Sequence, residues 1–444
     1  MSVAGLATPG AAGPTASAQR ASGHAWYVVA ALLVVSILGY VDRLILSFLI
    51  EPIKHDLLLS DTEVGLIAGL AFALLYVFAG IPIGRMIDRR RRVTVLSVCV
   101  LIWSVATAAS GLAGGFLSLF LARIGVGAGE AAVGPAAVSL VGDYFPPDQV
   151  QRPLGIFTVG LYAGGGFALI LGGQLIAYLT GLGMVDLPLL GPISAWRMTF
   201  LLLGLPGIVV TALLMTTVRE PLRRHRAEEV DQHGAIAFFK AHRKLLLLTM
   251  FSVIMWGFNG YGLLNWYPAM LMRSFGLTTH QVAWSYGPAF LLGGTLGALG
   301  LAPLTRWAAA RGRTDAVFFV SLFSMTLMGV SSIVGPMMPN AAGVIVISFL
   351  NLFGSSMTVA GVYAIITTVA PGRLRWLYTG IYMSVMNITG GAFGAVLVGV
   401  LTDHVFGAAG INLALMIVAV VFAPVASLLM FLAGREYRRA PPVF

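Results

Sequence analysis

Residues 26–50 read WYVVAALLVVSILGYVDRLILSFLI, an apolar run that contains two charged residues, Asp42 and Arg43. A helix of about 20 apolar residues is long enough to cross a bilayer. An ionised side chain at that depth costs at least about 2.5 kcal/mol, so such residues are rare and usually line a polar pathway. The run therefore predicts a membrane-spanning helix in which Asp42 and Arg43 have a functional role.

A second apolar run, residues 116–141, contains Arg123 and Glu130, which are seven positions apart. Seven residues make almost two helical turns, so the two side chains share one helix face about 10 Å apart. The other acidic residues can be placed in loops or at helix ends. We therefore expect Asp42, Glu130 and Arg123 to couple protons, with a static buried ion pair as the alternative.

The composition of the chain excludes a soluble globular protein. Of its 444 residues, 58% are hydrophobic and 10% are charged, whereas soluble domains carry about 25% charged residues. The mean hydropathy is +0.91. The predicted fold is all-α and integral to the membrane, with twelve transmembrane helices. These are expected near residues 25–49, 62–84, 93–113, 116–141, 153–180, 196–218, 245–272, 281–305, 314–335, 342–369, 373–402 and 409–433.

Basic residues are distributed asymmetrically between the predicted helices. If the N-terminus is cytoplasmic, all but five of the 27 Lys and Arg residues fall on the cytoplasmic side. The five exceptions are Arg43, Lys54, Arg123, Arg197 and Arg273. This bias is the positive-inside signal, and it explains the net charge of +10 without a nucleic-acid partner. We expect a multi-pass protein of the inner membrane with both termini in the cytoplasm.

One long polar stretch divides the predicted helices into six and six, an organisation that suits a transporter whose halves rock about a midplane site. Within that stretch, residues 235–244 (AIAFFKAHRK) are equally compatible with an amphipathic helix on the membrane surface and with a solvated linker. The expected parts are a disordered cytoplasmic tail (1–24), an N-terminal half (25–218), a cytoplasmic linker (219–244), a C-terminal half (245–433) and a second tail (434–444).

The segment between the second and third predicted helices reads GRMIDRRRR, residues 84–92. It resembles the signature cytoplasmic loop of the major facilitator superfamily, Gly-x-x-x-Asp-Arg followed by basic residues, with Arg91 in place of the usual glycine. The resemblance implies a charge latch that holds the outward-facing state. The predicted latch residues are Gly84, Asp88, Arg89 and Arg92.

Residues 123–132, RIGVGAGEAA, resemble the fourth-helix motif of the same superfamily, in which a buried arginine serves proton transfer. Together with YVDR (40–43), PIGRMIDR (82–89) and VREP (218–221), they resemble the Spinster-like branch, the sphingolipid and lysolipid transporters. These motifs lie in the N-terminal half, and the C-terminal half matches only in hydropathy and number of helices. The resemblance implies the twelve-helix major facilitator fold and transport by alternating access.

The two halves differ in their polar residues. The N-terminal half carries the intramembrane charges, whereas the C-terminal half offers aromatic and amide side chains, among them Tyr261, Asn265, Asn351 and Tyr382. This asymmetry suits an amphipathic substrate with an anionic or zwitterionic head. The predicted substrate-binding residues are Arg43, Arg123, Glu130, Tyr162, Trp256, Asn259, Tyr363 and Asn387.

The expected function is therefore proton-coupled secondary transport of a lysolipid-like, sphingoid-phosphate-like or organic-anion substrate. The alternative is a proton-coupled multidrug or organic-anion carrier unrelated to lipids. An enzyme would need a metal cluster, a nucleophile–base pair or a cofactor fingerprint, and the chain has no His-x-x-x-His pair and no Gly-x-Ser-x-Gly. A channel or a receptor is less favoured. We expect no cofactor or metal, a monomer, and the substrate, protons and membrane lipids as partners.

Overall fold

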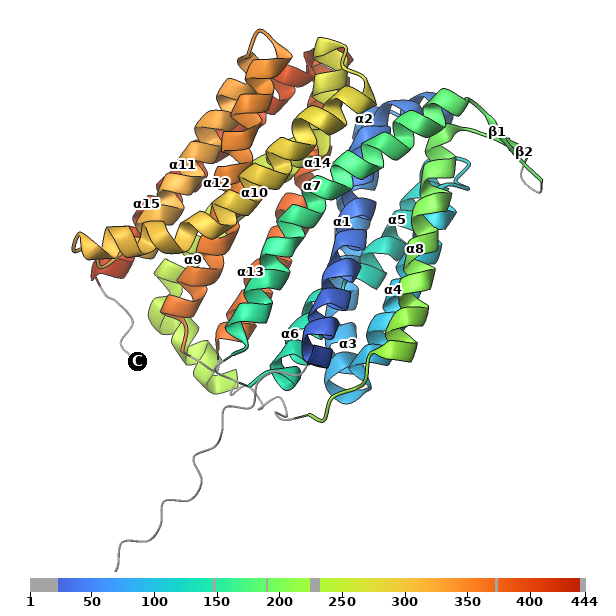
Figure 1. Ribbon diagram of the computed structural model, residues 1–444. Coiled ribbons are helices and arrows are strands. Elements are labelled where there is room, and N and C mark those ends of the chain that lie inside the picture. Colours follow the sequence, from blue (N-terminus) through green and yellow to red (C-terminus); the bar gives the residue numbers. More distant parts are fainter. Residues whose placement is uncertain (1–22, 147–148, 189–190, 224–231, 372–373, 440–444) are drawn as a thin grey trace, which may run out of the picture.

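The computed structural model describes residues 23–146, 149–188, 191–223, 232–371 and 374–439. Its helices lie side by side in one bundle (Figure 1). Twelve helical segments of this part of the chain are long and apolar enough to cross a membrane, in agreement with the twelve predicted helices. Most of the predicted tails, residues 1–22 and 440–444, lies outside the described residues.

The first six membrane-spanning segments form the N-terminal half, and two of them are interrupted. The second contains a π-helical segment, η1, and the fourth is broken just after Glu130. Pro135 accounts for the break, because a proline ring clashes with the carbonyl four residues earlier, here that of Ala131. The segments are α1 (Gly23–Leu57), α2–η1–α3 (Asp61–Gly65, Leu66–Ala71, Phe72–Arg89), α4 (Arg92–Ser110), α5–α6 (Phe116–Glu130, Val133–Tyr144), α7 (Gln151–Leu182) and α8 (Ala195–Thr217).

The C-terminal half contains the other six segments. Its first helix, α9, begins inside the predicted linker and has a kink at His242. The segments are α9 (Gln232–Phe275), α10 (Thr279–Ala310), α11–η2 (Ala316–Val334, Gly335–Met337), α12 (Ala341–Val369), α13–η3–α14–η4 (Arg375–Met386, Asn387–Gly391, Ala392–Leu401, Thr402–Phe406) and η5–α15 (Ala408–Gly410, Ile411–Arg439). The segments η3 and η4 are π-helical.

A short hairpin between α7 and α8 is an addition to the all-α prediction. Strands β1 (Val185–Leu187) and β2 (Gly191–Ile193) pair antiparallel, with Val185 opposite Ile193. Gly183 ends α7 with a φ of +69°, a conformation that favours glycine. The hairpin projects from one end of the bundle (Figure 1). We call this end the hairpin side, and the end at which α1 begins and α15 ends the terminal side.

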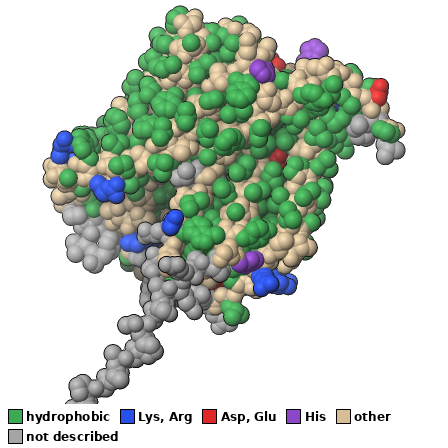
Figure 2. Space-filling view, viewed as in Figure 1, with side chains coloured by type: hydrophobic (Ala, Val, Ile, Leu, Met, Phe, Trp, Pro, Cys, Tyr) green, Lys and Arg blue, Asp and Glu red, His purple; other side chains and the backbone are tan. Residues whose placement is uncertain are grey.

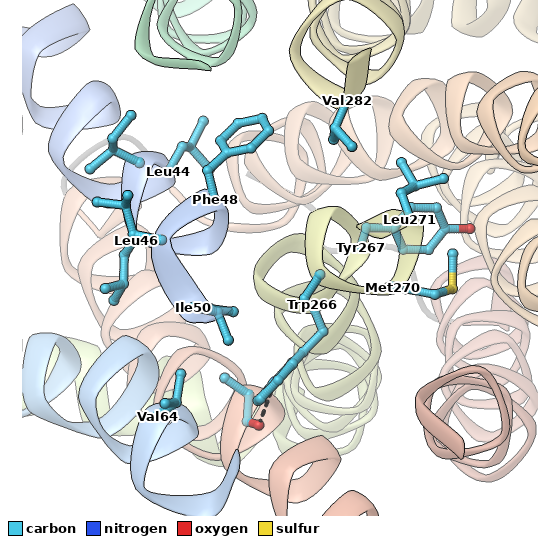
Figure 3. Close-up of a cluster of buried hydrophobic side chains, with 14 of the residues drawn as sticks. Leu44, Leu46, Phe48, Ile50, Val64, Trp266, Tyr267, Met270, Leu271 and Val282 are labelled. Carbon is cyan, nitrogen blue, oxygen red and sulfur yellow. Dashed lines mark hydrogen bonds between the residues drawn. The ribbon is translucent and has the colours of Figure 1, made fainter. Parts of the chain in front are cut away.

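A buried apolar cluster joins the two halves at the level of α1, α2, α9 and α10. Its side chains face one another between these helices (Figure 3). The indole N–H of Trp266 donates to the backbone oxygen of Ala395 at 2.9 Å, so the polar atom of this fully buried ring has a partner. Members drawn in the figure include Leu44, Leu46, Phe48, Ile50, Val64, Trp266, Tyr267, Met270, Leu271 and Val282.

The halves also touch through glycines that leave no room for a side chain. A Cβ atom added at Gly69 would lie 2.7 Å from the backbone oxygens of Gly391 and Ala392, and one at Gly399 would lie 2.4 Å from that of Asp61. Real Cβ atoms essentially never come this close to other heavy atoms. The backbones of the second segment and of η3–α14 are therefore in direct contact.

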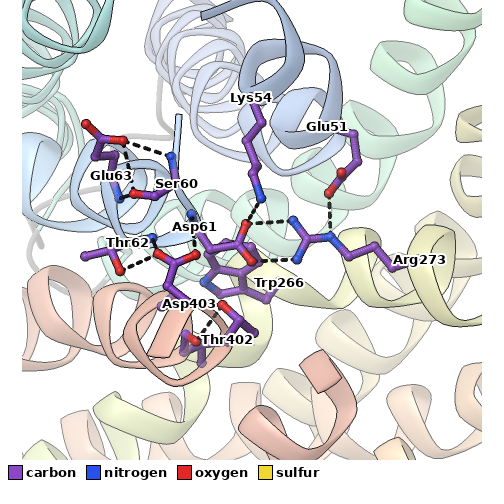
Figure 4. Close-up of polar contacts among 12 residues, drawn as sticks. Glu51, Lys54, Ser60, Asp61, Thr62, Glu63, Trp266, Arg273, Thr402 and Asp403 are labelled. Carbon is purple, nitrogen blue, oxygen red and sulfur yellow. Dashed lines mark hydrogen bonds and ion pairs between the residues drawn. The ribbon is translucent and has the colours of Figure 1, made fainter. Parts of the chain in front are cut away.

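Ion pairs connect the two halves on the hairpin side (Figure 4). Arg273 of α9 donates two hydrogen bonds to the carboxylate of Asp61, at 2.7 and 2.8 Å, and a third to Glu51 at 2.6 Å. Lys54 also contacts Asp61. From η4, the carboxylate of Asp403 accepts the backbone N–H groups of the first two residues of α2, at 3.1 and 2.6 Å. We call these contacts the hairpin-side tie.

On the terminal side, the ion pairs between described residues all lie within one half. Arg92 binds Asp143 and Glu220 in the N-terminal half, whereas Lys244 binds Glu436 in the C-terminal half. Figure 2 shows a mostly hydrophobic outer face with most of its visible Lys and Arg side chains towards this side. Among the described residues, the ion pairs that join the two halves therefore lie at the hairpin side.

Candidate functional site

Arg43 and Glu130 form an ion pair between α1 and the end of α5. The shortest distance, from Nη2 to Oε2, is 2.5 Å, and Nε lies 3.2 Å from the same oxygen. The Glu130 side chain is only 3% exposed, whereas that of Arg43 is 26% exposed. Gly39 packs beside the pair, since a Cβ added at this position would lie in ordinary contact, 3.4 Å from the carboxyl carbon of Glu130. Oε1 of Glu130 has no hydrogen-bond partner among the described residues.

Asp42 points in another direction, as expected for neighbouring residues about 100° apart on a helix. Its buried carboxylate accepts a hydrogen bond from Thr107 at 3.0 Å. Arg123 donates to the backbone oxygen of Asp42 at 3.1 Å and to Ser110 at 3.4 Å. Its guanidinium lies 4.7 Å from the centre of the Phe200 ring. The structure therefore holds Asp42 and Arg123 together within the N-terminal half.

The ion pairing of Glu130 is not evident from the spacing of Arg123 and Glu130 along α5. Arg123 and Glu130 share a helix, but the ion-pair partner of Glu130 is Arg43 on another helix. The carboxylate of Asp42 accepts a hydrogen bond from a threonine, while Arg123 contacts the Asp42 backbone instead. The four charged residues thus form two adjacent units. Arg43 and Glu130 lie at the interface between the halves, and Asp42 and Arg123 lie inside the N-terminal half.

A cavity between the halves receives the exposed part of Arg43. Its free volume is about 20 Å³ in this conformation, room for about one water molecule. On its C-terminal wall, the Tyr261 hydroxyl lies 3.0 Å from Oδ1 of Asn387, and Asn265 donates to the backbone oxygen of Tyr261 at 2.8 Å. The lining residues are Arg43, Leu44, Ala68, Gly69, Phe72, Ala73, Tyr261, Leu264, Asn265, Asn387 and Gly391.

Aromatic rings surround the Arg43 guanidinium. Its central carbon lies 4.2 Å from the ring centre of Phe72, 5.5 Å from that of Tyr76 and 5.7 Å from that of Tyr40. A cation within about 6 Å of a ring face is attracted to it. The rings therefore hold the guanidinium in place while its remaining N–H groups face the cavity.

The predicted substrate-binding residues do not all reach this cavity. Asn387 lines it, whereas Tyr162 and Tyr363 are not among its lining residues. Asn259, by contrast, is buried within the C-terminal half, where it donates to Ser332 at 2.9 Å.

Trp256 is also buried within the C-terminal half and does not line the cavity. Phe72 and Tyr76 are absent from the predicted set, because aromatic residues in an apolar helix carry no sign of which neighbour they face. The prediction includes Trp256 and Asn259 for the same reason, since a polar atom in such a helix can face a neighbouring helix as easily as a cavity.

The predicted latch residues lie on the terminal side. Arg92 is buried and bound to Asp143, Glu220 and Ser139, all in its own half. Asp88 and Arg89 are exposed at the end of α3 and form no hydrogen bond or ion pair with described residues. A Cβ at Gly84 would meet nothing within 4 Å. The loop is thus not engaged with the C-terminal half in this conformation.

No group of three or more His, Cys, Asp or Glu side chains that could hold a metal ion occurs within the described ranges. The charged groups of the site form an ion pair, Arg43 with Glu130, and a hydrogen bond from Arg123 to the backbone of Asp42. A guanidinium that already binds one carboxylate, and that also faces a cavity, can bind a second acidic group there.

Comparisons with known proteins identify the family and the fold. The family described as Major Facilitator Superfamily matches residues 32–323. An MFS-type efflux pump of Mycolicibacterium smegmatis is 29% identical, with 94% of both chains covered. The hexuronate transporter of Bacillus subtilis is 26% identical over 85% of this chain and 88% of its own.

Among solved structures, a bacterial homologue of the human lysosomal transporter Spinster, in an inward-facing and unoccupied conformation, superposes with a TM-score of 0.80. The two sequences are 25% identical, and the match covers 95% of this chain and 100% of that one. The predicted fold and the predicted Spinster-like resemblance are therefore confirmed.

Proposed function

Because the chain belongs to the major facilitator superfamily, we propose that it is a proton-coupled secondary transporter that binds the acidic group of an amphipathic substrate with Arg43. The family and fold are those of transporters rather than enzymes. The chain is a multi-pass membrane protein with twelve helices that can span the bilayer.

The observation that carries the proposal is the position of Arg43, bound to buried Glu130 on one side and open to the cavity on the other. A guanidinium can hold a carboxylate or phosphate with two parallel hydrogen bonds. A substrate that draws Arg43 away would leave Glu130 as a buried charge without its partner, which is strongly unfavourable. Proton uptake by Glu130 removes that charge, so substrate binding and protonation support each other.

The rest of the cavity supports an apolar substrate portion. Leu44, Phe72 and Leu264 line it together with small residues of η1, α3 and η3. The polar atoms of Tyr261 and Asn387 are partly occupied by each other. An amphiphile with one acidic group therefore fits the lining, with its apolar part against the aromatic and aliphatic side chains.

We propose that the terminal side is cytoplasmic, because the basic residues of the loops gather there. In this orientation the ion pairs that join the halves lie on the outward side. Residues 25–218 and 245–433 then move as two halves joined by the linker 219–244. A monomer in the plasma membrane suffices for this mechanism, since the cavity is built from one chain.

Replacing Arg43 tests the proposal in proteoliposomes with an imposed pH gradient. Lysolipids, sphingoid phosphates and organic anions are the candidate substrates. We expect R43K to impair uptake and R43A to abolish it, because lysine offers a point charge rather than a planar fork. R197K is the matched control, since Arg197 pairs with Asp56 outside the cavity. Full uptake by R43A would rule out capture by Arg43.

A second candidate is a small hydroxylated acid. The hydroxyls of Tyr40, Tyr76 and Tyr363 make no hydrogen bond to other described residues, and the relative from B. subtilis is named a hexuronate transporter. Changing these tyrosines to phenylalanine keeps the rings and removes the hydroxyls. A large loss of binding would favour the hydroxylated acid, whereas unchanged binding would favour the amphiphile.

A further inference from the structure

The first part of α9 lies apart from the membrane-spanning part of this helix. His242 has φ −113° and ψ 17°, which is not helical, and separates residues 234–241 from the remainder. We call residues 234–243 the angled segment. It lies at the terminal side, at an angle to the bundle (Figure 1). The sequence alone leaves open whether this stretch is an amphipathic helix on the membrane surface or a solvated linker.

One face of the angled segment is docked on α13. Ala235 is buried, and its backbone oxygen accepts a hydrogen bond from the Tyr378 hydroxyl at 3.1 Å. The Phe238 ring packs edge-on against the Tyr378 ring at 5.5 Å and against His242 at 4.7 Å. These contacts fix the rotation of the segment, and with it the side chains that the exposed face presents.

A neighbouring exposed face, about 100° around the helix from the docked one, combines apolar and basic side chains. Ile236 is 55% exposed and Phe239 is 38% exposed. Lys240 lies one turn after Ile236 and Arg243 follows the kink, and both are exposed. An amphipathic helix with exposed apolar residues and basic residues beside them is typical of segments that lie in the interfacial plane of a membrane.

The charge around this face is positive once the internal ion pairs are taken into account. The C-terminal half contains three acidic residues, Asp315, Asp403 and Glu436. Asp403 is on the hairpin side, where it caps α2. Asp315 is bound by Arg313 and Arg438, and Glu436 is bound by Lys244. Among the described residues of this half, the charges at the terminal side that form no ion pair are therefore basic. Glu228, Glu229 and Asp231, which precede the segment in the sequence, lie outside the described residues.

We propose that the angled segment is a binding site for anionic phospholipid. Ile236 and Phe239 enter the interfacial region of the adjacent leaflet, and Lys240 and Arg243 hold the phosphate of an anionic headgroup. The docked face explains why the segment stays in position, since Tyr378 connects it to α13. The proposal concerns the lipid surroundings of the protein and does not depend on the substrate or on which side is cytoplasmic.

Quenching by brominated lipids tests the proposal on the full-length protein. A fluorophore is attached to A237C, at an exposed position of the segment, while Cys99 is buried. The protein is placed in phosphatidylcholine nanodiscs that contain a minor fraction of brominated phosphatidylglycerol or, in a parallel sample, of brominated phosphatidylcholine. We expect phosphatidylglycerol to quench more strongly. An attraction of about 1 kcal/mol per basic side chain corresponds to about fivefold enrichment for each residue.

Three variants decide the outcome. K240Q/R243Q should remove the preference for phosphatidylglycerol, whereas R306Q/R311Q, which removes two charges from the end of α10, should keep it. I236S/F239S should reduce quenching by both lipids. The proposal is overturned if both lipids quench the wild type equally, or if the preference survives in K240Q/R243Q. It is also overturned if aqueous iodide quenches the label and neither lipid does.

Discussion

Ion pairs occur on both the hairpin side and the terminal side, but they connect different parts of the protein. Of the ion pairs between described residues, those that join the two halves lie on the hairpin side, whereas those on the terminal side each lie within one half. On the hairpin side, Arg273 of the C-terminal half is bound to Asp61 and Glu51 of the N-terminal half. On the terminal side, Arg92 and Lys244 are each bound within their own half. Ion pairs across the halves hold a conformation, whereas pairs inside a half hold that half rigid. Under the proposed rocking of the two halves, the ion pairs on the hairpin side are the contacts that must break.

The central ion pair of the hairpin-side tie is deeply buried. The Asp61 side chain is 1% exposed and that of Arg273 is 9% exposed. Removing one partner from such a buried pair is strongly destabilising. The exposed Asp88 of the terminal side forms no ion pair with described residues in this conformation. Substitutions at the two ends should therefore move the conformational balance in opposite directions.

The largest effect is expected for pH-driven transport when Asp42 is replaced. Asp42 lies in α1, between the hairpin side and the terminal side. Asp42→Asn should abolish pH-driven transport and leave the fold intact, because asparagine occupies the same volume and carries no titrating proton. Proteoliposome uptake at several imposed pH gradients measures this. Asp56→Asn, which removes an acid from the hairpin side, is the control. Wild-type pH dependence in Asp42→Asn would show that Asp42 is structural.

The second-largest effect is expected for substitutions in the hairpin-side tie, which should change the balance between the closed and open states of this side. Asp61→Asn removes the shared acceptor of Lys54 and Arg273 and should shift the balance towards opening of this side by about 3 kcal/mol, or about 100-fold. Spin labels at exposed Leu58 and His280, one in each half, report the change as a longer distance distribution. An unchanged distribution would mean that apolar packing alone closes this side.

A smaller effect of opposite sign is expected at the terminal side. If Asp88 accepts a charge-assisted contact only when the hairpin side is open, Asp88→Asn should disfavour that state by about 1.5–3 kcal/mol. The effect is best measured in the Asp61→Asn background, where the open state is populated. The double variant should recover shorter distances between the same two labels. Arg90→Gln in that background controls for a general loss of charge in the loop.

The smallest effect is expected at Asp403, which accepts the first N–H groups of α2 from the opposite half. Asp403→Asn keeps the shape and loses the charge that complements the helix N-terminus, a contribution of about 1 kcal/mol. The label distances should lengthen less than in Asp61→Asn. A larger shift than in Asp61→Asn would make the cap, rather than the ion pair, the main contact.

Much of the fold could be predicted from the sequence, because each apolar run is long enough to identify a membrane helix by itself. The intramembrane charges are also evident there, since Asp42, Arg43, Arg123 and Glu130 interrupt such runs. The pairing of Glu130 with Arg43 could not be predicted, because it depends on how α1 packs against α5. Spacing along one helix contains no information about contacts between helices.

The hairpin-side tie has a signal in the sequence that the predictions do not use. Lys54 and Arg273 are two of the five basic residues outside the predicted cytoplasmic side, and both bind Asp61. A basic residue that departs from the positive-inside distribution needs an acidic partner nearby. Which acid it finds depends on the meeting of α1, α2 and α9, and so only the structure identifies Asp61.

The glycine contact at Gly69 offers a means of trapping the other conformation for structural work. An added Cβ would lie 2.7 Å from two backbone oxygens of the opposite half. A methyl group at this position would therefore clash with that backbone and keep the halves from closing. Backbone atoms cannot rotate out of the way as a flexible side chain can. Gly69→Ala would thus hold the halves apart at this level, and a single added carbon could replace the antibody fragments and inhibitors commonly needed to capture a transporter open on this side.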